Sequence, residues 1–278
     1  MRSVPGHDKH LSYYDFGRTT VYACALDQRF SYSAYVPQSY EEEGSKRYRL
    51  LVSVHGTMRD MANYRDAFID LAERHQVIVL APLFPGGITQ PGELGSYKFI
   101  RAGALHYDAV LLSMVEELQA RYRLDAARFS LFGFSGGGHF AHRFFYLHPE
   151  RLAAVSVGAP GMVTLLDFDL DFWPGVRDFE TVFGKPLDVA AMRRTAIQLV
   201  VGGDDTDTWE ISVNPGDPSW MEGADRAGAN RQDRIWALKA SFEAQGIGVR
   251  HDVVPGVAHR REGIIPVVEA FLDEVYRG

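Results

Sequence analysis

The chain has 278 residues, of which 46% are apolar, so it can bury at least one sizeable core. Its net charge is −7 and it contains no basic block, which makes nucleic acid and anionic membranes poor partners. The single cysteine, Cys24, excludes an internal disulfide and is compatible with a reducing compartment. The sequence contains neither a secretion signal nor a membrane span, and we therefore expect a cytoplasmic protein.

Apolar segments with strand periodicity alternate with segments of helical periodicity along the chain. In the first half we expect, in order, strands at 18–25, 30–37 and 49–54, a helix at 64–75, a strand at 77–81 that Pro82 ends, and a helix at 104–122. In the second half we expect a strand at 128–132, a helix at 139–146, strands at 152–159 and 197–201, a helix at 230–245, a strand at 248–254 and a helix at 263–276. This alternation is typical of an α/β fold with a single doubly wound, mainly parallel sheet. Because the chain has no internal repeat and no low-complexity linker, we expect one domain over residues 1–278.

The most informative motif is Gly133-Phe134-Ser135-Gly136-Gly137, which lies between an expected strand and an expected helix. A serine on such a tight strand-to-helix turn is called a nucleophile elbow. Side chains two residues before and after the serine would collide with the turn, which explains Gly133 and Gly137. The turn lifts the Ser135 hydroxyl above the N-terminus of the next helix, where a developing negative charge is stabilised.

A dinucleotide-binding loop is the alternative for this segment, because Gly136, Gly138 and Ala141 fit the spacing Gly-x-Gly-x-x-Ala. That function needs an acidic residue at the end of the next strand, about 20 residues further on. The strand at 152–159 has no acid at its end. The sequence therefore favours the nucleophile elbow.

A serine hydroxyl becomes a good nucleophile only when a base removes its proton and a third group orients that base. In parallel sheets these groups belong on loops at the carboxyl ends of strands. His259 follows the strand at 248–254 and a short turn, so it is the candidate base. His251 lies inside that strand, and we expect it to be structural.

The candidate acid lies in the segment that follows the strand at 197–201. Asp204, Asp205 and Asp207 all occur there, and their spacing from Gly202 and Gly203 favours Asp205 while leaving the other two open. The nucleophile, acid and base then follow one another along the chain as Ser135, Asp205 and His259. This order differs from the orders in chymotrypsin and subtilisin.

An oxyanion hole should complete the site. One donor is expected to be the backbone N–H of Gly136, and the other that of Thr57 on the loop after the strand at 49–54, with Met58 as the reserve. We interpret His55 as a residue that braces this loop.

His139 and His142 lie three residues apart on the helix after the serine, a spacing that could hold a metal ion. No third ligand is placed to join them. A packing or surface role is therefore favoured, and we expect no metal site.

These motifs in this order resemble the α/β-hydrolase superfamily, esterase and lipase type. The resemblance covers residues 48–278 and depends on His55-Gly56, the elbow around Ser135, Gly202-Gly203-Asp204-Asp205, and His259. Because no large insertion follows the sixth strand, the chain is similar to the compact branch of poly(hydroxyalkanoate) depolymerase-like and feruloyl-esterase-like proteins. The resemblance implies hydrolysis of short-chain or aryl carboxylic esters through an acyl-enzyme on Ser135, with a small-molecule ester as the partner and without a cofactor.

Substrate choice is expected to depend on two segments that overhang the strand ends, 160–192 and 203–228. They are rich in aromatic residues, and Met58, Trp173 and Trp209 are the candidate substrate contacts. Other functions use the same scaffold and stay open: polyester depolymerase, peptidase, acyltransferase, cofactor-free haloperoxidase, lyase, or a non-catalytic binding protein. The sequence does not predict an oligomeric state.

Overall fold

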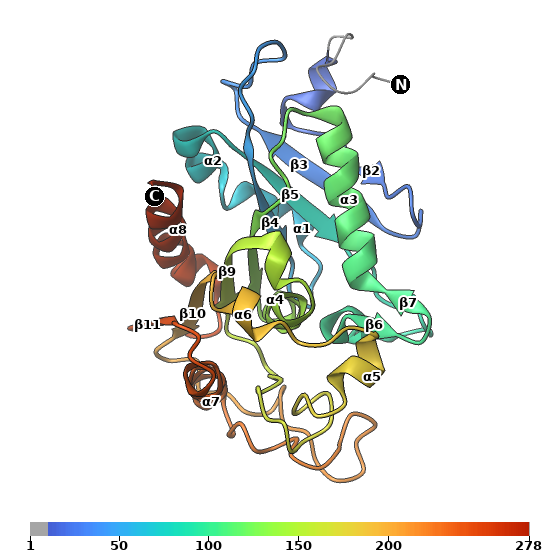
Figure 1. The fold of residues 1–278 in the computed structure, drawn as a ribbon, viewed down its shortest axis with the longest axis vertical. Coiled ribbons are helices and arrows are strands. Elements are labelled where there is room, and N and C mark those ends of the chain that lie inside the picture. The colour runs from blue at the N-terminus through green and yellow to red at the C-terminus, as the bar shows by residue number, and fades with distance from the viewer. Residues whose placement is uncertain (1–10, 278) are drawn as a thin grey trace.

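The computed structural model describes residues 11–277 (Figure 1). In this part of the chain one sheet has the strand order β1-β3-β5-β4-β8-β9-β10-β11, with β2 also paired to β3. Its strands are β1 (Gly17–Arg18), β2 (Tyr22–Ala23), β3 (Ser31–Val36), β4 (Arg49–Val54), β5 (Val77–Leu83), β8 (Phe129–Phe134), β9 (Leu152–Gly158), β10 (Ala196–Gly202) and β11 (Arg250–Val254). The pairs from β5 to β11 are parallel, whereas β3 is antiparallel to each of its neighbours. The predicted fold class, α/β with a doubly wound and mainly parallel sheet, is confirmed.

Helices cover both faces of this sheet, and Figure 1 shows α2 and α8 together on one side and α3 on the other. The helices are α1 (Met61–Asp66), α2 (Ile69–His75), α3 (Tyr107–Arg121), α4 (Gly136–Leu147), α5 (Phe179–Phe183), α6 (Val189–Met192), α7 (Arg231–Ala244) and α8 (Arg261–Arg277). Short 3-10 turns η1 (Tyr13–Asp15), η2 (Ser96–Phe99) and η3 (Pro149–Arg151), and the small hairpin β6 (Arg101–Ala102) and β7 (Leu105–His106), complete the described chain. The strands β4, β5, β8, β9 and β10 are buried along most of their length, which explains their continuous apolar sequence, whereas no residue of the edge strand β11 is fully buried.

The structure differs from the predicted elements where tertiary contacts decide the local conformation. The helix expected at 64–75 is broken at Phe68, whose ring is fully buried and packs edge to face on Phe132 at 5.2 Å between ring centroids. The strand expected to stop before Pro82 continues to Leu83. β4 pairs with β5 only as far as Leu80, so Pro82 lies where one side of the strand is unpaired and its missing N–H is tolerated.

Three other segments also depart from the predictions. The strand expected at 18–25 is two short strands, β1 and β2, each paired to β3. The start of the helix expected at 104–122 belongs instead to the hairpin β6–β7. The segment 160–192, expected to be irregular, contains the short helices α5 and α6. None of the helices described between residues 11 and 277 is long and apolar enough to cross a bilayer.

Candidate active site

Ser135 lies on the turn between β8 and α4, in a conformation that non-glycine residues rarely adopt, with φ 56° and ψ −116°. The flanking glycines make this turn possible. A Cβ added to Gly133 would collide with the carbonyl of Gly137, and one added to Gly137 would collide with the carbonyl of Val54. The Ser135 N–H donates to the carbonyl of Gly158 at 2.8 Å, which ties the turn to the neighbouring strand.

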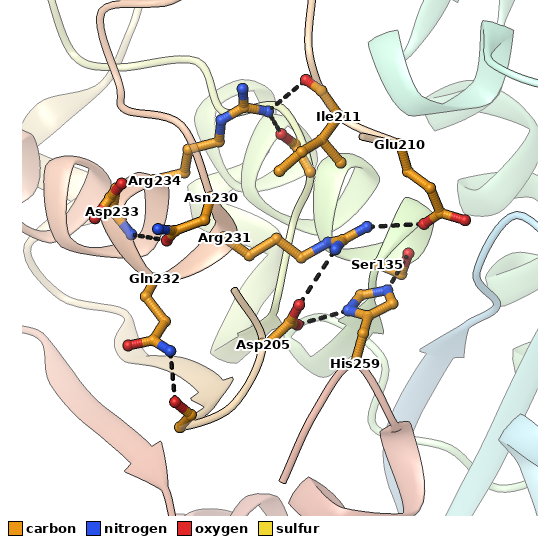
Figure 2. Close-up of polar contacts among 12 residues, drawn as sticks. Ser135, Asp205, Glu210, Ile211, Asn230, Arg231, Gln232, Asp233, Arg234 and His259 are labelled. Atoms are coloured by element: carbon orange, nitrogen blue, oxygen red, sulfur yellow. Dashed lines mark hydrogen bonds and ion pairs between the residues drawn. The ribbon is translucent and has the colours of Figure 1, made fainter. Parts of the chain in front are cut away.

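His259 approaches Ser135 from the loop between β11 and α8 (Figure 2). Its Nε2 is 3.0 Å from the Ser135 Oγ, and its Nδ1 is 2.6 Å from the Oδ2 of Asp205. The imidazole stacks on the Phe134 ring at 4.7 Å between centroids, so the residue before the serine also fixes the plane of the base. The three residues predicted to act together are therefore brought together, although up to 124 positions separate them along the chain.

The structure separates Asp205 from the two competing aspartates. The Asp205 side chain, on the loop that follows β10, is fully buried, whereas Asp204 and Asp207 are exposed. One Asp205 oxygen faces His259, and the other accepts a hydrogen bond from Arg231 Nη1 at 3.2 Å. Only Asp205 therefore has the contact that orients the imidazole.

Arg231 is a site residue that the sequence did not reveal. It lies in the first turn of α7 and its side chain is almost fully buried between Asp205 and Glu210, whose Oε2 is 3.1 Å from Nη2 (Figure 2). The next residue, Gln232, donates to the carbonyl of Gly203 at 2.7 Å, so the start of α7 holds the acidic loop at two points. No pattern marks Arg231 in the sequence, because its partners lie 26 and 21 positions away.

The loop after β4 places Thr57 beside the residue that follows the serine. A Cβ added to Gly136 would lie 3.1 Å from the backbone nitrogen of Thr57, so the two backbone N–H groups border the same small space. His55 braces this loop as predicted. Its Nε2 accepts from the Phe84 N–H at 2.9 Å, its Nδ1 contacts the Gly56 carbonyl at 2.8 Å, and burial lowers the pKa of His55 to about 4.

His139 and His142 are packing residues that hold the chain after β9 against α4. The Nε2 of His139 accepts from the backbone N–H groups of Gly161 and Met162, at 2.6 and 3.0 Å. The Nε2 of His142 accepts from that of Thr164 at 3.0 Å. Burial lowers the pKa of both histidines well below the ordinary value. Among residues 11–277, no group of three or more His, Cys, Asp or Glu side chains is arranged to hold a metal ion.

A pocket of about 600 Å³ opens above Ser135. Met58 and Trp209, two of the predicted substrate contacts, line it and are 90% and 76% exposed. Lys98, from η2, also lines it and was not predicted. Two larger hollows, of about 680 and 800 Å³, lie elsewhere and contain neither Ser135 nor His259.

Trp173 does not line this pocket, contrary to the prediction. It is buried, and its indole N–H donates to the carbonyl of Ser219 at 2.8 Å. Its ring packs against Phe99 at 6.3 Å between centroids. A buried indole needs a hydrogen-bond acceptor, and the segment 203–228 supplies one. Trp173 therefore joins the two overhanging segments to each other.

The sheet order, the strained serine after β8, and its partners after β10 and β11 together define an α/β hydrolase fold. No protein-family model and no curated protein matches the sequence. The structure is similar to poly(3-hydroxybutyrate) depolymerase from Bordetella parapertussis, with a TM-score of 0.70 and 25% identity over 89% of this chain and 87% of that one. It is also similar to poly(aspartic acid) hydrolase-1 from Sphingomonas sp. KT-1 (TM-score 0.69, 22% identity, 87% and 92% covered) and to a ferulic acid esterase (TM-score 0.60, 16% identity, 93% and 96% covered).

Proposed function

We propose that the protein is a serine hydrolase that cleaves carboxylic esters through an acyl-enzyme on Ser135. The observation that carries this proposal is the continuous hydrogen-bonded series from Ser135 through His259 to the buried Asp205, with distances of 3.0 and 2.6 Å. This is the geometry that catalytic triads need. The presence of a ferulic acid esterase among the proteins of similar fold supports the choice of an ester substrate.

In the proposed mechanism His259 removes the proton of Ser135, whose Oγ attacks the ester carbonyl carbon. The backbone N–H groups of Thr57 and Gly136 donate to the oxyanion, and Asp205 keeps the proton of His259 on Nδ1 so that Nε2 is free to act as the base. The protonated His259 then gives its proton to the leaving alcohol. Water attacks the acyl-enzyme by the same route, and this chemistry requires no metal or organic cofactor.

The proposed partner is a small-molecule ester. The net charge of −7 argues against nucleic acid and anionic membranes as partners, and the single cysteine is compatible with a cytoplasmic location.

Two measurements together test this proposal: labelling with a fluorophosphonate and an ester assay. We expect the probe to modify Ser135, and the modified protein to lose turnover of p-nitrophenyl butyrate. The variant Ser135→Ala should neither be labelled nor turn over the ester. An adduct on a different residue, or full activity in Ser135→Ala, would contradict the mechanism.

A further inference from the structure

The chain is acidic overall, yet unpaired cations surround the pocket above Ser135. Arg59, Arg143 and Arg234 donate to backbone carbonyls or a hydroxyl, and none forms an ion pair with a carboxylate in the described part of the chain. Arg143 donates to the carbonyl of Lys98, and Arg234 donates to that of Ile211, so both lie directly behind the pocket lining. These three cations are therefore not neutralised by direct pairing with a carboxylate of the described chain.

Lys98 adds a cation to the lining of the pocket itself. A Cβ added to Gly136 would lie 3.1 Å from the Lys98 Cε, so the end of this side chain lies close to the proposed oxyanion donors. Its Nζ forms no hydrogen bond or ion pair with any residue between 11 and 277. The other lysines of that range differ in this respect, because Lys46 contacts Gln76, Lys185 contacts Glu150 and Lys239 contacts Glu243.

The carboxylate that lines the pocket, that of Glu210, forms no ion pair with Lys98. Glu210 is paired with Arg231, at 3.1 Å, and Arg231 also contacts Asp205. Burial lowers the pKa of the Lys98 amine to about 8, because its charge is partly removed from water without a partner. A carboxylate from a ligand would supply the missing partner through a charge-assisted hydrogen bond.

We propose that this pocket selects esters that carry a free carboxylate in addition to the ester group, and that the Lys98 ammonium binds this carboxylate. The inference rests on the proposed ester hydrolysis and assigns its substrate class. Lys98 is a specificity-determining residue in this account. It binds the part of the substrate that does not react, so its contribution is largest for anionic esters and small for neutral ones of the same shape.

Two pairs of esters test the inference, each matching an anion with a neutral molecule of similar shape. On the acyl side the pair is p-nitrophenyl hydrogen adipate and p-nitrophenyl 6-methylheptanoate. On the alcohol side it is 4-carboxyphenyl acetate and 4-carbamoylphenyl acetate. The measured quantity is the ratio of kcat/KM for the anionic ester to that for the neutral one, in the natural protein and in Lys98→Met, which keeps most of the side-chain volume.

In at least one pair we expect the ratio to fall by about tenfold or more in Lys98→Met, the size expected of a hydrogen bond to a charged group. Lys98→Arg should retain part of the preference, and Lys239→Met, which removes a surface charge, should retain all of it. A ratio that Lys98→Met leaves unchanged in both pairs overturns the inference. If the ratio is unchanged because kcat/KM falls equally for the anionic and the neutral ester, Lys98 acts on the oxyanion instead. If neither member of a pair is turned over and the fluorophosphonate does not label Ser135, the proposed function itself is wrong.

Discussion

At the scale of single residues, the site depends on how Asp205 is held. Its carboxylate is fully buried and contacts two groups, the imidazole of His259 and the guanidinium of Arg231. A buried carboxylate without such partners would be costly, because it loses its hydration. Arg231 binds one oxygen of the Asp205 carboxylate and so fixes the orientation of the group. The other oxygen contacts His259. The acid is therefore positioned before a substrate arrives.

The variant Asp205→Asn should lower kcat by about 10⁴, the size of the corresponding loss in a serine protease, because an amide in this place favours the wrong tautomer of His259. Its matched control is Asp207→Asn, which makes the same chemical change on an exposed side chain and should leave kcat within about twofold. The rates are measured with p-nitrophenyl butyrate, and circular dichroism and urea unfolding show whether each variant is folded. A severe loss in Asp207→Asn together with an active Asp205→Asn would mean that the acid has been assigned to the wrong residue.

The proposed role of Lys98 also predicts a pH dependence. Two cations near it, Arg59 and Arg143, favour the neutral amine and add to the effect of burial, while Glu93 and Glu210 oppose it, and the pKa of Lys98 is lowered to about 8. Lys98 is therefore positively charged below pH 8 and loses its charge as the pH rises through that value.

We expect the preference for the anionic ester to be constant below about pH 7 and to fall as the pH rises through about 8, because kcat/KM reports the ionisation of the free enzyme. The measurement is the ratio of kcat/KM for the anionic ester to that for its neutral counterpart, in the pair that shows the preference, between pH 6 and 10. His259 acts on both esters of the pair, so the effect of its ionisation cancels from the ratio. In Lys98→Met the ratio should not change with pH. A preference in the natural protein that grows toward high pH would have the wrong sign.

At the scale of elements, the sequence predicts most reliably the features that the backbone itself demands. The elbow could be found because a serine at φ 56° needs glycines at fixed positions around it. His259 and the acidic loop could be found because the carboxyl ends of parallel strands meet at one edge of the sheet. Arg231, Lys98 and the buried position of Trp173 could not, because they depend on side chains that meet only after distant segments have folded together.

The elbow gives a prediction on stability as well as on activity. Gly137→Ala should lower the free energy of unfolding by about 3 kcal/mol, because the new methyl group meets a backbone carbonyl of β4 that cannot move aside easily. Labelling of Ser135 should slow in the same variant as the turn is displaced. Both effects are measured, the first by urea unfolding and the second by the rate of fluorophosphonate labelling.

The control is Gly248→Ala, in an exposed loop, where an added Cβ has no heavy atom of the described chain within 4 Å. Its free energy of unfolding should change by less than about 0.5 kcal/mol. Equal stability of the two variants would show that the chain around Gly137 relaxes without strain.

At the scale of the whole molecule, the overhanging segments 160–192 and 203–228 shape the pocket without closing it. Trp173 and Ser219 join them by one hydrogen bond, and Arg234 ties both to α7 through the carbonyls of Gly161 and Ile211. Met58 and Trp209 remain largely exposed at the pocket. The helices between β9 and β10 are only five and four residues long, too short to form a helical lid over the site.

This openness predicts a preference for short acyl or aryl esters. Each methylene that stays in water forgoes about 0.8 kcal/mol of binding, so a long acyl chain gains no additional transition-state stabilisation. An apolar chain laid over the unpaired Lys98 would also remove water from a charge without giving it a partner. We therefore expect kcat/KM for p-nitrophenyl esters to reach its maximum at short acyl chains, and no rise in activity when a substrate passes its solubility limit and forms an interface. The measurement is a series of acyl lengths at fixed pH, with aryl esters beside it. If kcat/KM instead keeps rising beyond about ten acyl carbons, the aromatic side chains of the two segments must close over the substrate as an apolar tunnel.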